Sequence, residues 1–227
     1  MTFGITILLL AMQNPILVAE NAASLDWITN GNYVLGVGLG YRPEEFEALG
    51  VEFEQRVSRF EEAIPLIRRL WNEESVTHHG QHFNVSGLGA SIKPKRAGGP
   101  PIWVGGDVIA AVQRAAKLNC PWIAPPTMTF HEIAERVEVY RKASAEISGN
   151  SVNEQPIIRE VAIGSTKAEA LRAARPALLS KYESYASWGQ TATKEQVSLS
   201  DSFDEFIKDR FIIGDESEVA DEVARYK

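Results

Sequence analysis

The segment Asn-Gly-Asn-Tyr-Val-Leu-Gly-Val-Gly-Leu-Gly-Tyr-Arg-Pro-Glu-Glu-Phe, residues 30–46, organises the chain. It joins an Asn-Gly turn to a short apolar run, Tyr33–Val37, and glycines alternate at Gly36, Gly38 and Gly40. An apolar run of about five residues between turn signals predicts a buried strand of a parallel sheet. Glycines at the end of such a strand allow a flat ligand or another backbone to approach closely. The segment therefore predicts a strand whose end faces a ligand.

Two other interpretations of these glycines stay open. A dinucleotide-binding loop has its third glycine three places after the second, and Tyr41 occupies that position here. Alternatively, small residues in a buried strand serve packing alone and need no ligand. Neighbouring segments have to decide between these interpretations.

The composition bounds the class of protein. The chain has 227 residues, and 44% of them are hydrophobic, which is ample for a core. A net charge of −7 argues against nucleic acid and anionic membranes as partners, and no apolar run approaches the roughly 20 residues of a spanning helix. Cys120 is the single cysteine and cannot form an internal disulfide, so a reducing, cytoplasmic setting is expected.

Strand and helix patterns alternate along the chain, which predicts an α/β fold with a parallel sheet. Strands are expected at Phe3–Leu10, Tyr33–Val37, Pro100–Gly106, Trp122–Ala124, Ile157–Gly164 and Phe211–Gly214, and the almost wholly apolar first one is expected to be buried. Helices are expected from Asn14-Pro15 to Ile28, from Gln55 to Glu73 with a kink at Pro65, over Asp107–Leu118, from Thr129 to Ile147 with a stop at Gly149, from Thr166 with an interruption at Pro176, and from Asp215 into Lys227. The Ser75–Gly99 segment is expected to lie outside the main sheet, and Tyr182–Ser202 is polar with scattered aromatic residues.

Local signals support several of these helices. Asn14 before Pro15 is a favoured helix start, and Leu17, Leu25 and Ile28 share one face of the helix that follows. Thr129-x-x-Glu132 and Thr166-x-x-Glu169 are capping-box patterns. The helix over residues 55–73 carries an apolar stripe spaced 3-4-3-4, formed by Val57, Phe60, Ile64, Ile67 and Trp71.

Three groups of motifs, in this order and spacing, resemble the bacterial-luciferase-like monooxygenase family. The first runs from Asn14-Pro15 through Leu25-Asp26 and Asn30-Gly31 to Leu35–Tyr41 and Glu45–Gly50; the second from Glu62-Ala63 through Leu70-Trp71, His79-Gly80 and Lys93-Pro94 to Pro100–Gly106; the third comprises Arg210–Asp215 and Glu218–Ala220. The resemblance covers nearly the whole chain.

The resemblance implies a TIM (β/α)8 barrel in a single partial domain, residues 1–227, that holds about strands 3 to 7, with residues 75–99 as an excursion. It implies an oxidoreductase that uses reduced FMN and molecular oxygen on a small organic substrate. The alternatives are hydride transfer from the deazaflavin coenzyme F-420, and a shortened relative that binds flavin or dimerises without catalysis. A homodimer and a separate flavin reductase are the partners that the resemblance leaves open.

The resemblance also assigns expected cofactor-binding residues. In the family a non-proline cis peptide bond forms a bulge behind the flavin ring, and it falls here at Thr6-Ile7; a trans bulge or regular strand is the alternative. Gly36 and Gly38 lie on the glycine strand, and Tyr41 and Arg42 follow it. Arg42 is equally suited to a surface ion pair with Glu45.

Gly105-Gly106-Asp107 resembles the family's loop for the cofactor phosphate. Two glycines expose backbone N–H groups, and a helix N-terminus adds positive potential. Asp107 departs from the family pattern, because a carboxylate is a good N-cap but repels a phosphate. Phosphate binding and plain helix capping are both open at this loop.

Other residues have simpler interpretations. His78, His79 and His82 lack a carboxylate or cysteine spaced to complete a metal site, so a hairpin is expected there and no metal site is predicted. Asn119-Cys120-Pro121-Trp122 stands where relatives usually have Gly-Asp-Gly-Trp, Cys120 is expected to be a small buried residue, and Trp103 is expected in the core. No catalytic acid or base is named, because the substrate-orienting residues commonly lie on the first two strands of the family's barrel.

Overall fold

The computed structural model of the protein describes residues 1–148, 155–189 and 199–226. The chain divides into two compact units, which are described separately. The first unit comprises Met1–Ile123 and Val139–Pro156, and the second comprises Ala124–Glu138 and Ile157–Lys227.

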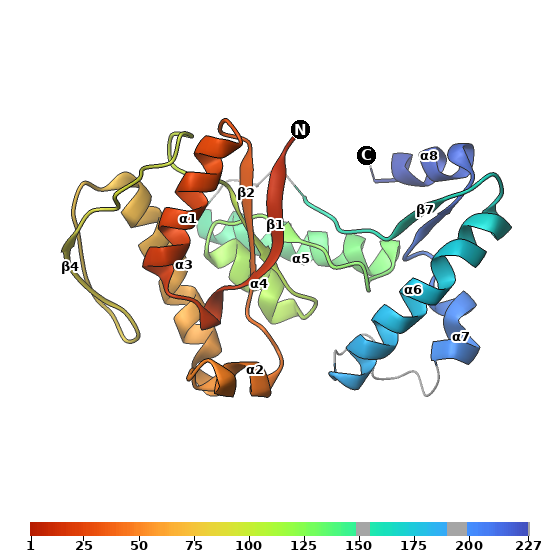
Figure 1. Ribbon diagram of the computed structural model, residues 1–227, viewed down its shortest axis with the longest axis horizontal. Helices are drawn as coiled ribbons and strands as arrows, with labels where there is room; N and C mark the ends of the chain where they lie inside the picture. Colours follow the sequence, from red (N-terminus) through yellow and green to blue (C-terminus); the bar gives the residue numbers. More distant parts are fainter. Residues whose placement is uncertain (149–154, 190–198, 227) are drawn as a thin grey trace. The chain divides into compact units, whose positions relative to one another are not determined.

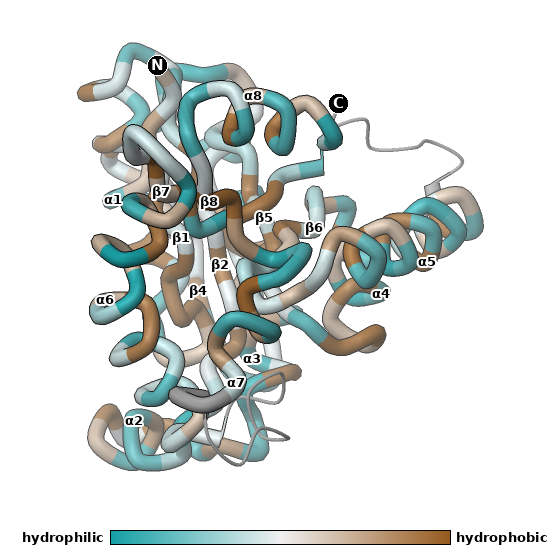
Figure 2. Tube along the Cα trace, turned by 90° about the vertical axis from the view of Figure 1, so that its right-hand side faces the viewer, coloured by the Kyte–Doolittle hydropathy of each residue, from teal (hydrophilic) through white to brown (hydrophobic). Residues whose placement is uncertain are grey.

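A parallel four-stranded sheet forms the centre of the first unit. Its strands are β1 (Phe3–Leu9), β2 (Tyr33–Gly38), β5 (Ile102–Gly105) and β6 (Trp122–Ile123), in the order β1-β2-β5-β6. Figure 2 shows the four strands in this order. All three pairings are parallel, and all six residues of β2 are buried. The predicted α/β class and the buried glycine strand are therefore confirmed.

The expectation that the first strand is buried was wrong for its N-terminal half. β1 lies at one end of the strand order and pairs with β2 alone among the described strands. Its first four residues are exposed, and Phe3 and Ile5 keep 51% and 38% of their surface accessible. An apolar sequence predicts that a strand can be buried, but burial depends on neighbouring elements that the strand's own sequence does not specify.

Helices cover this sheet and connect its strands (Figure 1). The helical segments of the first half of the chain are the 3₁₀ turn η1 (Leu10–Met12), α1 (Pro15–Ile28), α2 (Pro43–Ala48), the 3₁₀ turn η2 (Phe53–Gln55), α3 (Arg56–Asn72) and α4 (Ile109–Lys117). α5 (Phe130–Ser148) begins in the second unit and ends in the first. Asn14 caps α1 by accepting a hydrogen bond from the Ile16 N–H at 2.9 Å, as predicted.

The buried face of α1 is formed mainly by small residues and not by its leucines. Leu17, Leu25 and Ile28 do share one face, but that face is exposed, with Leu17 at 59% and Ile28 at 78%. The buried residues of α1 include Val18, Ala19, Ala22 and Ala23. α1 packs against α3, and the Trp71 indole N–H donates to the Ala19 carbonyl at 2.9 Å. Alanines permit this close approach between the two helices, and larger side chains would prevent it.

The predicted stripe on α3 is largely confirmed. Phe60, Ile64, Ile67 and Trp71 are buried, whereas Val57 is only partly so. Pro65 lies inside the helix, which continues to Asn72.

An antiparallel hairpin follows α3 and forms its own two-stranded sheet. It consists of β3 (Val76–His79) and β4 (Asn84–Leu88), so the hairpin expected around the histidines is present. It is separate from the four-stranded parallel sheet.

The described part of the second unit contains a parallel pair of strands and three helices of its own. These are β7 (Val161–Ile163), α6 (Lys167–Ser187), α7 (Leu199–Phe206), β8 (Ile212–Gly214) and α8 (Glu216–Ala224). Its apolar core contains several aromatic rings. The centroid of the Tyr182 ring lies 5.0 Å from that of Phe206 and 5.1 Å from that of Phe211.

Several expected boundaries in the second unit were wrong. The strand expected over Ile157–Gly164 is regular over three residues only, preceded by an isolated bridge between Ala124 and Ile157. α6 continues through Pro176 and includes Tyr182, and α8 ends at Ala224. The last helix therefore does not run into Lys227, and the expected stop at Gly149 lies outside the described residues.

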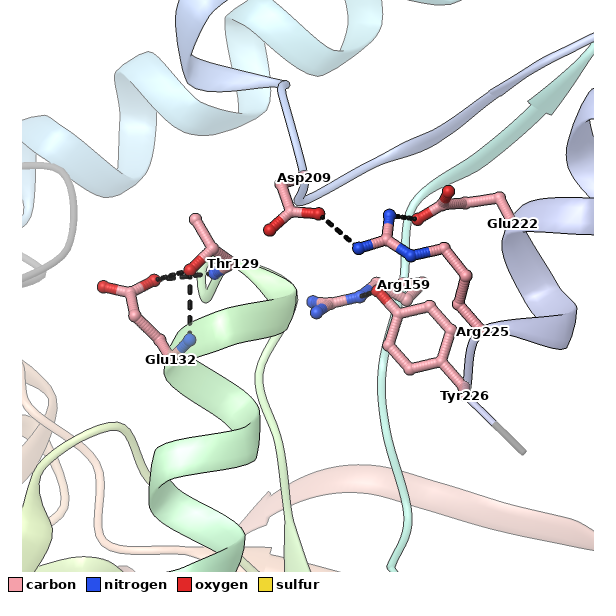
Figure 3. A network of polar contacts seen from close by, with 7 residues as sticks. All are labelled: Thr129, Glu132, Arg159, Asp209, Glu222, Arg225 and Tyr226. Carbon is pink, nitrogen blue, oxygen red and sulfur yellow. Dashed lines mark hydrogen bonds and ion pairs between the residues drawn. The ribbon is translucent and has the colours of Figure 1, made fainter.

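Polar contacts join the ends of helices in the second unit (Figure 3). Glu132 accepts from the N–H of Thr129, and Thr129 accepts from the N–H of Glu132, which confirms this capping box. The Arg225 guanidinium bridges Asp209 at 3.0 Å and Glu222 at 2.6 Å. These contacts hold the end of α8 against the segment that precedes β8.

None of the helices within the described ranges is both long and apolar enough to cross a membrane.

Candidate functional site

The expected cis peptide bond is present in β1. Thr6-Ile7 is cis, and the pairing of β1 with β2 shifts its register between Ile5 and Leu8. The alternative of a regular trans strand at this position is therefore excluded. The Ile7 side chain, within this register shift, lies against Gly38 of β2 and Gly105 of β5.

Those glycines make room for the bulge itself. A Cβ atom at Gly36 would lie 2.5 Å from the Ile5 carbonyl oxygen, and one at Gly38 would lie 2.9 Å from Ile7 Cγ2. A Cβ at Gly105 would lie 2.1 Å from Ile7 Cδ1. The sequence left open whether a ligand or another part of the chain approaches these glycines. The structure shows that β1 does. Gly36 and Gly38 on β2 and Gly105 on β5 leave the room that Ile5, Thr6 and Ile7 of β1 occupy.

Trp103 belongs to the same face of the sheet. It precedes Gly105 by two residues on β5, and side chains two apart on a strand point to one side. It is also the register partner of Gly36. We call Ile7, Gly36, Gly38, Trp103 and Gly105 the glycine face. Trp103 is partly buried, and its Nε1 is buried without a hydrogen-bond partner among the described residues.

The loop after β5 differs from its expected form. Val108, not Asp107, is the N-cap of α4, and no side chain caps this helix, so the predicted capping role of Asp107 was wrong. A Cβ at Gly106 would lie 2.4 Å from the Ala111 Cβ, so this glycine lets α4 fold back closely onto the strand end. The Gly106 carbonyl accepts the Trp122 indole N–H at 2.7 Å. Gly106 is thus required by its contact with Ala111 of α4. The helix begins at Ile109, two residues later than the expected start at Asp107.

Tyr41 and Arg42 lie in the segment that leads from β2 into α2. Arg42 is the N-cap residue of α2, and its guanidinium pairs with Glu45 at 2.8 Å and Glu44 at 3.1 Å. The surface ion pair with Glu45 is therefore formed. Tyr41 is exposed. The structure thus brings Thr6, Ile7 and three of the predicted glycines into contact, whereas Tyr41, Arg42 and Asp107 follow the ends of their strands.

Arg68 on α3 is a residue that the sequence did not single out. Its guanidinium donates to the Leu118 carbonyl at 2.6 Å and to the Asn119 carbonyl at 2.9 Å, and it contacts Cys120 Sγ at 3.1 Å. It therefore anchors the turn between α4 and β6, where Asn119 has a positive φ of 51°. Arginines occur on both flanks of the α3 apolar stripe, so no local signal distinguishes this one.

Cys120 is buried, as expected, and it is chemically protected. Burial raises the pKa of its thiol to about 11, although Arg68 acts in the opposite direction. Because the thiolate is the reactive form, we expect Cys120 in the folded protein to react with a disulfide reagent at least about 100-fold more slowly than in urea at pH 8. Rapid labelling of the folded protein would contradict this burial.

Glu62 on α3 organises the histidine hairpin. Its Oε1 lies 2.9 Å from His78 Nε2 and accepts the Phe83 N–H at 2.9 Å, and its Oε2 accepts the His82 N–H at 2.9 Å. A Cβ at Gly80 would lie 1.9 Å from Glu62 Oε1, which explains the glycine in the His79-Gly80 motif. Within the described ranges no group of three or more His, Cys, Asp and Glu side chains is arranged for a metal ion. The histidines next to Glu62 therefore serve the hairpin's attachment to α3.

Replacing Glu62 with alanine is expected to destabilise the protein by about 2–3 kcal/mol, because two part-buried N–H groups, those of His82 and Phe83, lose their acceptor. Glu61 is a matched control on the same helix: it is 30% exposed and pairs with the mostly buried Arg114 and the exposed Lys117, and its alanine variant is expected to cost less than Glu62→Ala, about 1 kcal/mol. Urea unfolding at pH 7 measures both. Equal costs would contradict the role of Glu62.

The same carboxylate predicts a pH dependence. Burial alone raises the pKa of Glu62, but the hydrogen bonds from His78, Phe83 and His82 outweigh it and hold the pKa below its ordinary 4.5. Its stabilising contribution is therefore complete above pH 4.5 and declines as the pH falls below that value. Between pH 5 and 3 the wild type is expected to lose more unfolding free energy than Glu62→Gln. Parallel losses would contradict the lowered pKa.

Comparison with known proteins places this geometry in a family. Residues 1–227 match the model of the luciferase-like monooxygenases. The phthiodiolone/phenolphthiodiolone dimycocerosates ketoreductase of Mycobacterium kansasii is 31% identical over 145 residues, which cover 63% of this chain and 39% of the relative. The chain thus spans about two fifths of the length of this curated relative.

Two solved structures share the fold. The oxygenating constituent of 3,6-diketocamphane monooxygenase from the CAM plasmid of Pseudomonas putida, in complex with FMN, has a TM-score of 0.78 at 19% identity, over 98% of this chain and 68% of that one. An F420-dependent secondary alcohol dehydrogenase, in complex with an F420-acetone adduct, has a TM-score of 0.78 at 17% identity, over 99% of this chain and 70% of that one. The likeness confirms the expected TIM-barrel class of fold. With the family match over its full length, the chain belongs to the luciferase-like monooxygenase family.

Proposed function

We propose that this chain forms the cofactor-binding part of an oxidoreductase that uses reduced FMN and molecular oxygen on a small organic substrate. The observation that carries the proposal is the packing of the Ile7 side chain against Gly38 of β2 and Gly105 of β5. This packing places the apolar Ile7 side chain over the glycines of β2 and β5, on one face of the sheet. An apolar side chain in this position can support one side of a planar ring.

The residues present fit a ring cofactor. The glycine face offers the apolar surface of Ile7 and the ring of Trp103, and the buried indole N–H of Trp103 is a donor with no partner among the described residues. The redox chemistry, reduction of oxygen with FMN or delivery of a hydride with a deazaflavin, belongs to the cofactor. The chain's own residues would bind and orient the ring and exclude water from its covered side. We assign no acid or base.

Ketone reduction with the deazaflavin coenzyme F-420 is the second candidate function. It is favoured by the ketoreductase from Mycobacterium kansasii, which is 31% identical to the aligned part of this chain. Both candidates require the same kind of site, because FMN and F-420 share a planar tricyclic ring system with carbonyl acceptors along one edge. They differ in the reaction that follows binding.

A fluorescence titration of the purified chain with FMN and with F-420 tests the proposal. We expect saturable binding of one of them with a Kd in the micromolar range, equivalent to roughly −8 kcal/mol. If F-420 binds and FMN does not, ketone-dependent oxidation of reduced F-420 is then expected, and the oxygen reaction is excluded. Failure of both ligands to bind would contradict a cofactor-binding role for this chain.

A further inference from the structure

The Trp103 indole differs from the other buried or partly exposed indoles whose contacts are described. The N–H groups of Trp27, Trp71 and Trp122 each donate to a backbone carbonyl, at 2.8, 2.9 and 2.7 Å respectively. The Trp103 N–H is buried and has no acceptor in the described parts of the chain. A buried donor without an acceptor costs about 1–3 kcal/mol, so proteins rarely leave one in place.

The surroundings of Trp103 explain why its donor stays unpaired. Its register partner on β2 is Gly36, which has no side chain to accept a hydrogen bond. The adjacent part of β1 presents the Thr6 Cγ2 methyl group, which would lie 3.1 Å from a Cβ at Gly36, and the Thr6 hydroxyl makes no hydrogen bond with the indole N–H. On its own strand, Gly105 follows two residues later on the same face. Neither the glycines nor Thr6 therefore satisfies the indole N–H within the described parts of the chain.

The position of the donor indicates the kind of group that would satisfy it. Trp103 lies on the strand that carries Gly105, the glycine against which Ile7 packs. A planar ring supported by Ile7 would present its edge along the sheet, and carbonyl oxygens and ring nitrogens on that edge accept hydrogen bonds in the plane of the ring. An indole has one donor and no acceptor, so it selects for an acceptor.

We propose that the Trp103 indole N–H binds the acceptor edge of the ring cofactor, donating to a carbonyl oxygen or ring nitrogen of its pyrimidinedione portion. This inference rests on the proposed function, since it assumes that the glycine face holds a flavin or deazaflavin ring. The hydrogen bond makes Trp103 a binding residue that fixes the rotation of the ring about its own normal. Ile7 supports the ring, and Trp103 orients it.

The direct test is the indole N–H resonance of Trp103 in protein labelled with ¹⁵N at the tryptophan indoles. Trp103→Phe assigns the resonance by its disappearance. On addition of FMN, and in a separate sample F-420, the Trp103 resonance is expected to shift downfield and its exchange with solvent to slow. The resonance of Trp27, which lies on α1 and already donates to Lys93, is expected to stay in place.

Two variants measure the strength of the contact. Trp103→Phe removes the donor, and we expect the Kd of the bound cofactor to rise about 5- to 20-fold. Trp27→Phe is the matched control and should leave the Kd unchanged. Benzothienylalanine at position 103 replaces the N–H by sulfur while keeping the shape of the ring, so it separates the lost hydrogen bond from a change in packing. It is expected to weaken binding as much as phenylalanine does.

The outcomes separate the inference from the proposed function. If neither FMN nor F-420 binds the wild-type chain, the proposed function fails and the inference fails with it. If a cofactor binds but the Trp103 resonance stays in place and benzothienylalanine leaves the Kd unchanged, the inference alone is overturned. A shift with one cofactor only would identify which of the two the edge contact recognises.

Discussion

Gly105→Ala is expected to destabilise the protein by about 2–3 kcal/mol and to abolish cofactor binding. The added methyl group would lie 2.1 Å from Ile7 Cδ1, so Ile7 has to leave its place. Overpacking of a well-filled site costs about 1–3 kcal/mol, and Ile7 is also packed against Gly38 of β2. Urea unfolding and the fluorescence titration measure the two effects.

A second substitution distinguishes this clash from a general loss of packing. Ile7→Val removes Cδ1 and keeps both γ carbons, so it should restore most of the stability lost in Gly105→Ala. The same change should not rescue Gly38→Ala, because the methyl group at Gly38 meets Ile7 Cγ2, at 2.9 Å. Equal rescue of both glycine variants, or of neither, would show that Ile7 is not seated as described.

Gly99→Ala is the other change with a large expected effect, about 3 kcal/mol. Gly99 has a φ of 91° and its added Cβ would lie 2.2 Å from the ring of Trp71. That ring is 4% exposed and holds a hydrogen bond to Ala19, so it cannot move aside freely. The cost combines backbone strain of about 1 kcal/mol with overpacking.

Gly98 provides the matched control for this substitution. It has a φ of 82°, and a Cβ there would have no atom within 4 Å. Gly98→Ala therefore carries the backbone strain alone and should cost about 1 kcal/mol. A thermal melt of both variants gives the comparison. If Gly98→Ala and Gly99→Ala proved equally destabilising, packing against Trp71 would have no part in the effect.

Features encoded by short motifs were predictable from the sequence. The capping box at Thr129 and Glu132 satisfies backbone donors within one turn, so its pattern and its geometry coincide. The cis bond at Thr6-Ile7 was found through the family resemblance, and the glycines that accept it stand on two other strands. Their spacing indicated a close approach correctly, although β1 rather than a ligand proved to be the near neighbour.

Features set by distant partners were not predictable. The leucines of α1 have the spacing of a buried face, yet alanines on the other side allow the closer contact with α3. Asp107 has the side chain of an N-cap, but the contact of Gly106 with Ala111 moves the start of the helix. The missing partner of the Trp103 N–H is likewise a tertiary property, since nothing in the sequence marks which of several tryptophans lacks an acceptor.

The central claim is that the glycine face binds the ring of the cofactor, and backbone amide resonances locate that binding directly. In a ¹H–¹⁵N spectrum of the chain titrated with FMN or F-420, the amides of Ile7, Gly36, Gly38 and Gly105 are expected to shift the most. The amides of β7 and β8 in the second unit serve as the reference. Shifts confined to another part of the chain, or saturable binding that leaves those four amides unmoved, would contradict the claim.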